Sequence, residues 1–253
     1  MLHHTFNIIK LRWPEVALVL VPQIGLILLF ERLLLTDGIT PSRAGQIPDG
    51  AMFVLGCGGM LMLVVWQMLY LGFLRTASLD GPAPQEPMML FRTGRPFFWR
   101  ILAVQCVLGA ALWLVTGLLA GVIAAGMGYQ TAAAFPQWLL ELAGVASIAL
   151  LVKPFFLIPA FMLAMDCSAM EAFGMMRQIR LGRVGPLLKA YAVGLAVIAA
   201  VAVISALAPK DTAVYYIAAA SRYGVQSLIV LALMLATVLL LTPEAEADAD
   251  SEE

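Results

Sequence analysis

The chain has 253 residues, of which 62% are hydrophobic and 12% are charged, and its mean hydropathy is +0.93. Soluble domains carry about 25% charged residues, so this chain has too little polar surface to cover a soluble globule of its length. The composition excludes a disordered chain, a disulfide scaffold and most soluble enzyme folds, and it predicts an all-α polytopic membrane protein.

The formal net charge of −1 hides an uneven distribution of charge along the chain. Six of the 16 acidic residues lie between Glu244 and Glu253, so the remainder carries fifteen basic and ten acidic residues, a net charge of +5. A segment of the composition EAEADADSEE cannot bury enough apolar surface to fold. We therefore expect residues 243–253 to form a disordered acidic cytoplasmic tail.

Six apolar runs dominate the rest of the chain, and a transmembrane helix needs about 20 mostly apolar residues. The runs cover residues 14–35, 51–74, 101–127, 138–163, 187–208 and 223–241. We expect each run to cross the membrane once. The prediction for residues 1–242 is therefore a bundle of six transmembrane helices with amphipathic segments at the cytoplasmic interface.

The Lys and Arg residues between the runs and near their ends predict the orientation, because cytoplasmic loops carry an excess of them. Four lie on one side of the predicted bundle, and ten lie on the other. The ten are Lys10, Arg12, Arg75, Arg92, Arg95, Arg100, Arg177, Arg180, Arg183 and Lys189. We expect both termini in the cytoplasm and the protein in the bacterial plasma (inner) membrane.

Glycine and alanine recur at every fourth position of the third run, as Gly117, Gly121 and Ala125. This spacing places small side chains on one helix face and lets a second helix approach closely. We interpret the three residues as a helix-packing face. Its partner is another helix of the bundle or, alternatively, an oligomer or partner subunit.

Lys153 lies near the middle of the fourth run, where an ionisable side chain costs about 2.5–3.5 kcal/mol and marks a functional hypothesis. Pro154 and Pro159 follow it, and each proline removes a backbone donor and frees a carbonyl, which favours a broken helix. In one interpretation, Lys153 lines a polar cavity for an anion or lipid headgroup. In the other, it caps the freed carbonyls or is buried against a partner subunit.

The inner loop after the fourth run predicts an amphipathic helix at the membrane surface. Ser168 and Glu171 have capping-box spacing, apolar residues follow at helical spacing, and Gly182 is expected to end the helix in the left-handed conformation. Arginines of the two inner loops are candidate contacts for anionic inner-leaflet lipids or for a partner: Arg177, Arg180, Arg183, Arg92 and Arg95. Alternatively, these arginines only follow the positive-inside rule.

The stretch LVKPFFLIPAFMLAMDCSAMEAFGMMRQIRLGR, residues 151–183, resembles the signature of a broad group of six-pass bacterial membrane proteins. Pro82–Arg95 is similar to the inner loop of that group, in which a proline precedes a glycine. The group includes Yip-like proteins and the membrane domain attached to some glycerophosphodiester phosphodiesterases, whose catalytic domain has no counterpart here. The resemblance implies a six-pass fold and a membrane location, and it implies no catalytic residue.

Motifs for catalysis, cofactors and nucleic acids are missing from the sequence. His3 and His4 are its two histidines, its three cysteines are dispersed, and it has no phosphate loop, GxSxG motif or basic-aromatic pattern. We predict a non-enzymatic accessory, assembly or scaffold subunit of a larger membrane complex, or a membrane-organising protein. Its expected partners are anionic lipids and other membrane subunits or a second copy, without a cofactor or nucleic acid. The alternative is a small transporter or channel built around Lys153 and the broken fourth helix.

Overall fold

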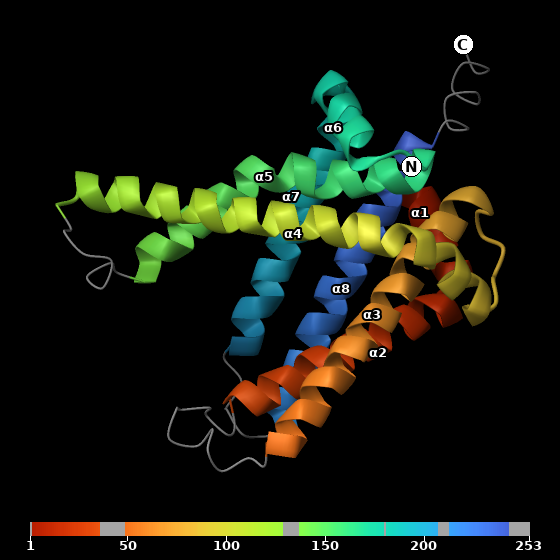
Figure 1. Ribbon diagram of the computed structural model, residues 1–253, viewed down its shortest axis with the longest axis horizontal. Helices are drawn as coiled ribbons and strands as arrows, with labels where there is room; N and C mark the ends of the chain where they lie inside the picture. The colour runs from red at the N-terminus through yellow and green to blue at the C-terminus, as the bar shows by residue number, and fades with distance from the viewer. Residues whose placement is uncertain (1, 36–48, 129–136, 180, 207–212, 243–253) are drawn as a thin grey trace. The chain divides into compact units, whose positions relative to one another are not determined.

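The computed structural model describes residues 2–35, 49–128, 137–179, 181–206 and 213–242, and these ranges contain helices and short turns without a strand. The all-α prediction is confirmed for this part of the chain. Figure 1 shows the helices α1 (Leu2–Leu11), α2 (Trp13–Leu35), α3 (Asp49–Leu79), α4 (Pro87–Gly126), α5 (Gln137–Met165), α6 (Ala169–Gln178), α7 (Leu181–Ala206) and α8 (Ala213–Leu241). The predicted acidic tail lies outside the described residues.

The helices are longer than the apolar runs that predicted them. The inner loop expected at Arg75–Arg100 is mostly helical, because α3 continues to Leu79 and α4 begins at Pro87. Proline suits the first position of a helix, where its missing N–H has no intrahelical partner. With 40 residues, α4 is about 60 Å long, about twice the thickness of a hydrocarbon core.

Three described helices are long and apolar enough to cross a membrane, within Cys57–Leu79, Pro87–Gly126 and Ile217–Leu241. The count rises to five if two sharply bent helix pairs each form one span. These pairs are His3–Leu11 with Trp13–Leu28, bent by 85°, and Lys153–Met165 with Ala169–Gln178, bent by 114°. By length and composition, these helices are compatible with a membrane protein.

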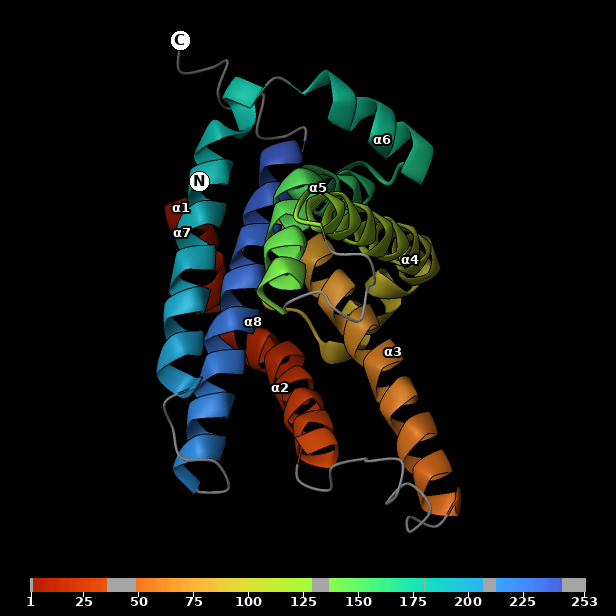
Figure 2. The same ribbon diagram turned by 90° about the vertical axis from the view of Figure 1, so that its left-hand side faces the viewer.

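The chain divides into two compact units. Unit 1 comprises Met1–Phe98 and Arg180–Glu253, and unit 2 comprises Trp99–Ile179. Within unit 1, α8 packs beside α7, α2 and α3, as Figure 2 shows for α7 and α8. A 2.5 Å hydrogen bond between the buried hydroxyl groups of Tyr191 and Thr237 ties α7 to α8. Within unit 2, α5 packs against α6.

A close helix approach in unit 1 joins α3 to the first turns of α4. A Cβ atom added to Gly72 would lie 2.6 Å from the carbonyl carbon of Leu90, and one added to Gly94 would lie 2.8 Å from that of Met68. Real Cβ atoms essentially never approach so closely. Glycine is therefore required at both positions for the two backbones to meet.

The predicted packing face of α4 makes no such close backbone contact among the described residues. An added Cβ would meet nothing within 4 Å at Gly117 or Gly121, and Ala125 is exposed. Unit 2 instead buries Ala120 and Ala124 together with Ala143 of α5. The helix-packing role of the Gly117–Gly121–Ala125 face stays a prediction, since in the described part of unit 2 the neighbouring alanine face makes the contact with α5.

The capping box that begins α6 is confirmed. Ser168 Oγ accepts a hydrogen bond from the backbone N–H of Glu171, and the Glu171 carboxylate accepts one from the backbone N–H of Ser168 at 2.8 Å. The predicted stop at Gly182 is wrong, because α6 ends at Gln178 with the extended residue Ile179 as its cap. Gly182 lies inside α7.

The capping box makes the start of α6 sensitive to pH. The hydrogen bonds from the Ser168 backbone and hydroxyl hold the pKa of the Glu171 carboxyl below its usual value. The ionised carboxylate therefore stabilises α6 above the unfolded pKa, and this stabilisation is lost as the pH falls through the lowered folded pKa. We expect Ser168→Ala to speed hydrogen exchange at the Glu171 amide at neutral pH, with Ser78→Ala on α3 as the control. An unchanged exchange rate would contradict this role of the cap.

Candidate functional site

A buried ion pair lies where the chain turns from α1 into α2. Arg12 is 0% exposed and Glu15 is 5% exposed. Arg12 Nε donates to Glu15 Oε2 at 3.0 Å, and Arg12 Nη2 donates to the same oxygen and to Thr76 Oγ1, the latter at 2.8 Å. The guanidinium carbon also lies 5.1 Å from the centroid of the Phe73 ring. The start of α2 is thereby fixed to the end of α3.

The same pair holds the turn between α3 and α4. Glu15 Oε1 accepts the backbone N–H of Gln85 at 2.7 Å, and Arg12 Nη1 donates to the Gly81 carbonyl at 3.4 Å. Gly81 has a φ of +61°, which glycine adopts without a steric penalty. The cluster of Arg12, Glu15 and Thr76 therefore connects four segments of unit 1, and we call it the Arg12 clamp.

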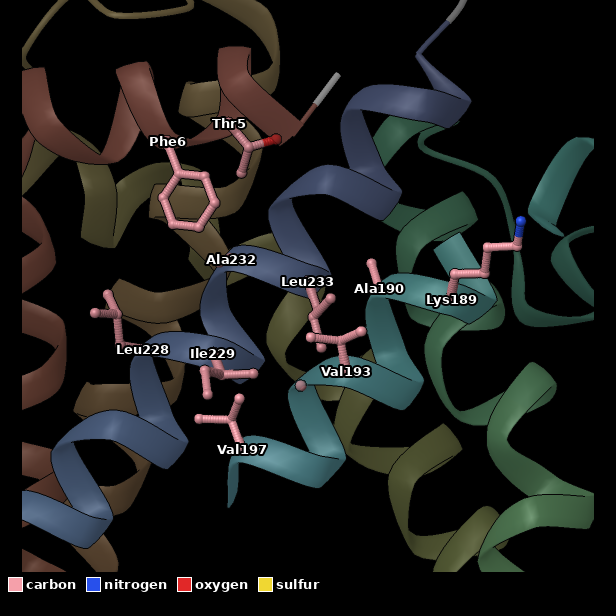
Figure 3. Close-up of a pocket in the computed structure, with 11 residues that line it drawn as sticks. Thr5, Phe6, Lys189, Ala190, Val193, Val197, Leu228, Ile229, Ala232 and Leu233 are labelled. Atoms are coloured by element: carbon pink, nitrogen blue, oxygen red, sulfur yellow. The ribbon is translucent and has the colours of Figure 1, made fainter. Parts of the chain in front are cut away.

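A groove of about 450 Å³ lies between α1, α7 and α8, also within unit 1 (Figure 3). Aliphatic side chains of α7 and α8 face each other across it, and Lys189 extends away from them with its amino group at the far end. The lining residues are Thr5, Phe6, Lys189, Ala190, Val193, Gly194, Val197, Leu228, Ile229, Ala232 and Leu233. The lining thus combines an apolar wall with one cationic side chain, Lys189, which is exposed.

The predicted polar site around Lys153 has a different geometry from the one expected. Helix α5 runs without interruption through Pro154 and Pro159, so the prediction of a broken helix there is wrong. The chain leaves the helix at Asp166, whose φ of +48° is left-handed, and the helix tolerates the prolines before that point. Lys153 and Pro154 are half-buried and Pro159 is buried. Lys153 does not line the groove described above.

The five candidate arginines do not form one described cluster. Arg92 and Arg95 are exposed on α4 in unit 1, and Arg177 is exposed on α6 in unit 2. Arg180 lies outside the described residues, and so does the side chain of Arg183. Their proposed contact with lipids or a partner stays a prediction. The described ion pair of unit 2 is formed by another arginine, Arg100, whose Nη1 lies 3.1 Å from Asp166 Oδ1.

Sequence reasoning missed both the Arg12 clamp and the groove. In the sequence, Arg12 and Lys189 are two of the ten basic residues that predict the orientation, and no apolar run covers residues 2–11. The spacing of Arg12 and Glu15, three residues apart, is a usable signal because such side chains meet on a helical turn. The groove has no comparable local signal, since its lining comes from segments more than 180 residues apart in the sequence.

The described helices define the class as an all-helical protein with three to five candidate membrane-spanning segments. Comparison with protein-family models, curated proteins and solved structures gave no match to this chain. The resemblance of residues 151–183 to the six-pass bacterial group therefore stays a prediction.

Proposed function

We propose that this chain is a non-enzymatic accessory subunit of a larger membrane complex, with α4 as the helix that contacts the partner. The observation that carries the proposal is the low burial of α4. Only 6% of its apolar spanning window is buried within the chain, compared with 33% for α3 and 56% for α8. Within unit 2, a helix of spanning length with so little burial leaves apolar surface that can contact a helix of another membrane protein.

The exposed side of α4 combines small and large apolar side chains, as helix-packing surfaces in membranes do. Gly117, Gly121 and Ala125 line one strip, and the glycines leave open space where a Cβ would be. Large exposed apolar side chains occupy the same stretch: Trp113, Leu114, Leu118 and Val122. In membranes, small residues allow backbones to approach and larger neighbours to pack, since helix association there depends on van der Waals contact.

The proposed topology has six spans, with both termini in the cytoplasm of a bacterial inner membrane. The ten-to-four distribution of Lys and Arg supports this orientation. Anionic inner-leaflet lipids are proposed contacts of the exposed Arg92, Arg95 and Arg177. The transporter alternative now rests on Lys153 alone, because the broken helix on which it depended is continuous.

The test is a double substitution that fills the strip. We expect Gly117→Leu with Gly121→Leu to remove most of the partner that co-purifies with the tagged full chain after gentle extraction, because leucine side chains prevent close approach. Gly58→Leu on α3 is the matched control, since an added Cβ there also meets nothing within 4 Å. Equal recovery of the partner with the double variant and the control would contradict the proposed role of α4.

A further inference from the structure

We propose that the groove between α1, α7 and α8 binds one anionic phospholipid, with an acyl chain along the apolar wall and the phosphate at Lys189. This inference is independent of the proposed accessory role. It rests on the shape of the groove, on the chemistry of its lining and on the position of its one cation.

The wall of the groove matches a hydrocarbon chain. Val193 and Val197 of α7 face Ile229 and Leu233 of α8, and Phe6 of α1 contributes an aromatic ring. A volume of about 450 Å³ lies within the range of about 300–1,000 Å³ typical of ligand sites. Because α8 is long and apolar enough to cross a membrane, a lipid acyl chain is the apolar ligand that we assign to this groove.

The groove is open along one side and closed at its floor. Val193 is 64% exposed, so the α7 wall is accessible from outside the unit. At the floor, a Cβ added to Gly194 would lie 2.9 Å from Ile229 Cγ2 and 3.1 Å from Leu233 Cδ1. The absence of a side chain at Gly194 therefore lets α7 and α8 meet beneath the groove. An acyl chain can enter laterally without passing through the protein.

The positive charge of Lys189 favours a lipid with an anionic headgroup. Among the described lining residues, Lys189 is the charged one and none is Asp or Glu. Its amino group lies at the end of a long aliphatic stem that points away from the apolar wall, as lysines do when they reach toward headgroups (Figure 3). An ammonium in this position attracts the phosphate of an anionic lipid and gives a zwitterionic lipid a smaller advantage.

The probe is phosphatidylglycerol that carries a photoreactive diazirine in its acyl chain. The purified full chain is reconstituted with this lipid in a phosphatidylcholine background and irradiated, and cross-linked peptides are mapped by mass spectrometry. We expect adducts to concentrate on 189–197 and 228–233. The same experiment with diazirine-labelled phosphatidylcholine is expected to give about fivefold fewer adducts in the groove, the effect of one lysine near an anionic headgroup.

Two matched pairs of variants separate groove binding from general lipid contact. Lys189→Gln removes the rim charge, and Lys10→Gln removes an exposed lysine outside the lining. Val193→Trp fills the groove, and Val214→Trp places the same ring at an exposed valine of similar exposure, 60%, outside the lining. We expect Lys189→Gln to lower phosphatidylglycerol adducts in the groove about fivefold and Val193→Trp to abolish them, with each control within twofold of the wild type.

Three results would overturn the proposal. The first is a uniform distribution of adducts over all apolar helices. The second is that the anionic and zwitterionic lipids label the groove equally and that Lys189→Gln does not change this labelling. The third is protection of the groove peptides without a lipid adduct, which would mean that another part of the chain or a protein covers the groove. A loss of adducts with Val193→Trp counts in favour only if the variant retains the wild-type unfolding midpoint.

Discussion

Replacement of Arg12 by methionine is expected to lower the free energy of unfolding by about 3–5 kcal/mol. The substitution leaves the Glu15 carboxylate buried, with the backbone N–H of Gln85 as a partner and without the cation that neutralises it. It also removes the hydrogen bond to Thr76 and the contact with the Phe73 ring. The measurement is a chemical unfolding titration of the purified protein in detergent.

Two further variants identify the cause of the loss. The double variant Arg12→Met with Glu15→Met removes both charges, and we expect it to recover much of the stability, because apolar replacement of a whole buried pair is often neutral or better. Arg100→Gln breaks the exposed pair with Asp166, whose side chains are 53% and 59% exposed, and should cost about 0–1 kcal/mol. Equal losses for Arg12→Met and Arg100→Gln would show that the Arg12 clamp is not a buried structural pair.

Substitution of alanine for Gly72 or Gly94 is expected to force α3 and α4 apart. The added methyl group would overlap the backbone carbonyl of Leu90 or Met68, and a backbone cannot yield as the end of a side chain can. Overpacking of this kind costs about 1–3 kcal/mol, and we expect values at the upper end or beyond. The measurement is the same unfolding titration in detergent.

The controls for this pair lie on the same two helices. Gly58 on α3 and Gly109 on α4 have no atom within 4 Å of an added Cβ. Alanine there should stabilise the helix by about 0.5–1 kcal/mol, because glycine loses more backbone entropy on folding. If all four variants shifted stability in the same direction, the close approach of α3 and α4 would be refuted.

The sequence predicted local features well where one chemical pattern determines them. Apolar runs located the six long helices, and the Ser168–Glu171 spacing located the start of α6. Helix ends were harder to predict, because a helix continues past the last apolar residue until a cap or an extended residue stops it. This is why α3 and α4 extend into a predicted loop and why Ile179, rather than Gly182, ends α6.

Long-range contacts were the part that spacing could not predict. Gly117 and Gly121 have the spacing of a packing motif, yet Gly72 and Gly94 make the close contact, because the choice depends on which helix faces lie opposite each other. The Arg12 clamp likewise depends on a turn 69 residues away in the sequence. Two prolines in α5 predicted a break that the helix does not have, since neighbouring groups can satisfy freed carbonyls.

The most direct test of the accessory role is a photoreactive amino acid placed at Leu118 in the exposed face of α4. The label is irradiated in native membranes, with the same label at the buried Leu108 of the same helix as the control. We expect a cross-link from position 118, but not from position 108, to one different membrane protein in near-stoichiometric yield. Lipid adducts alone, a cross-link within the chain, or a cross-link only to a second copy would contradict it.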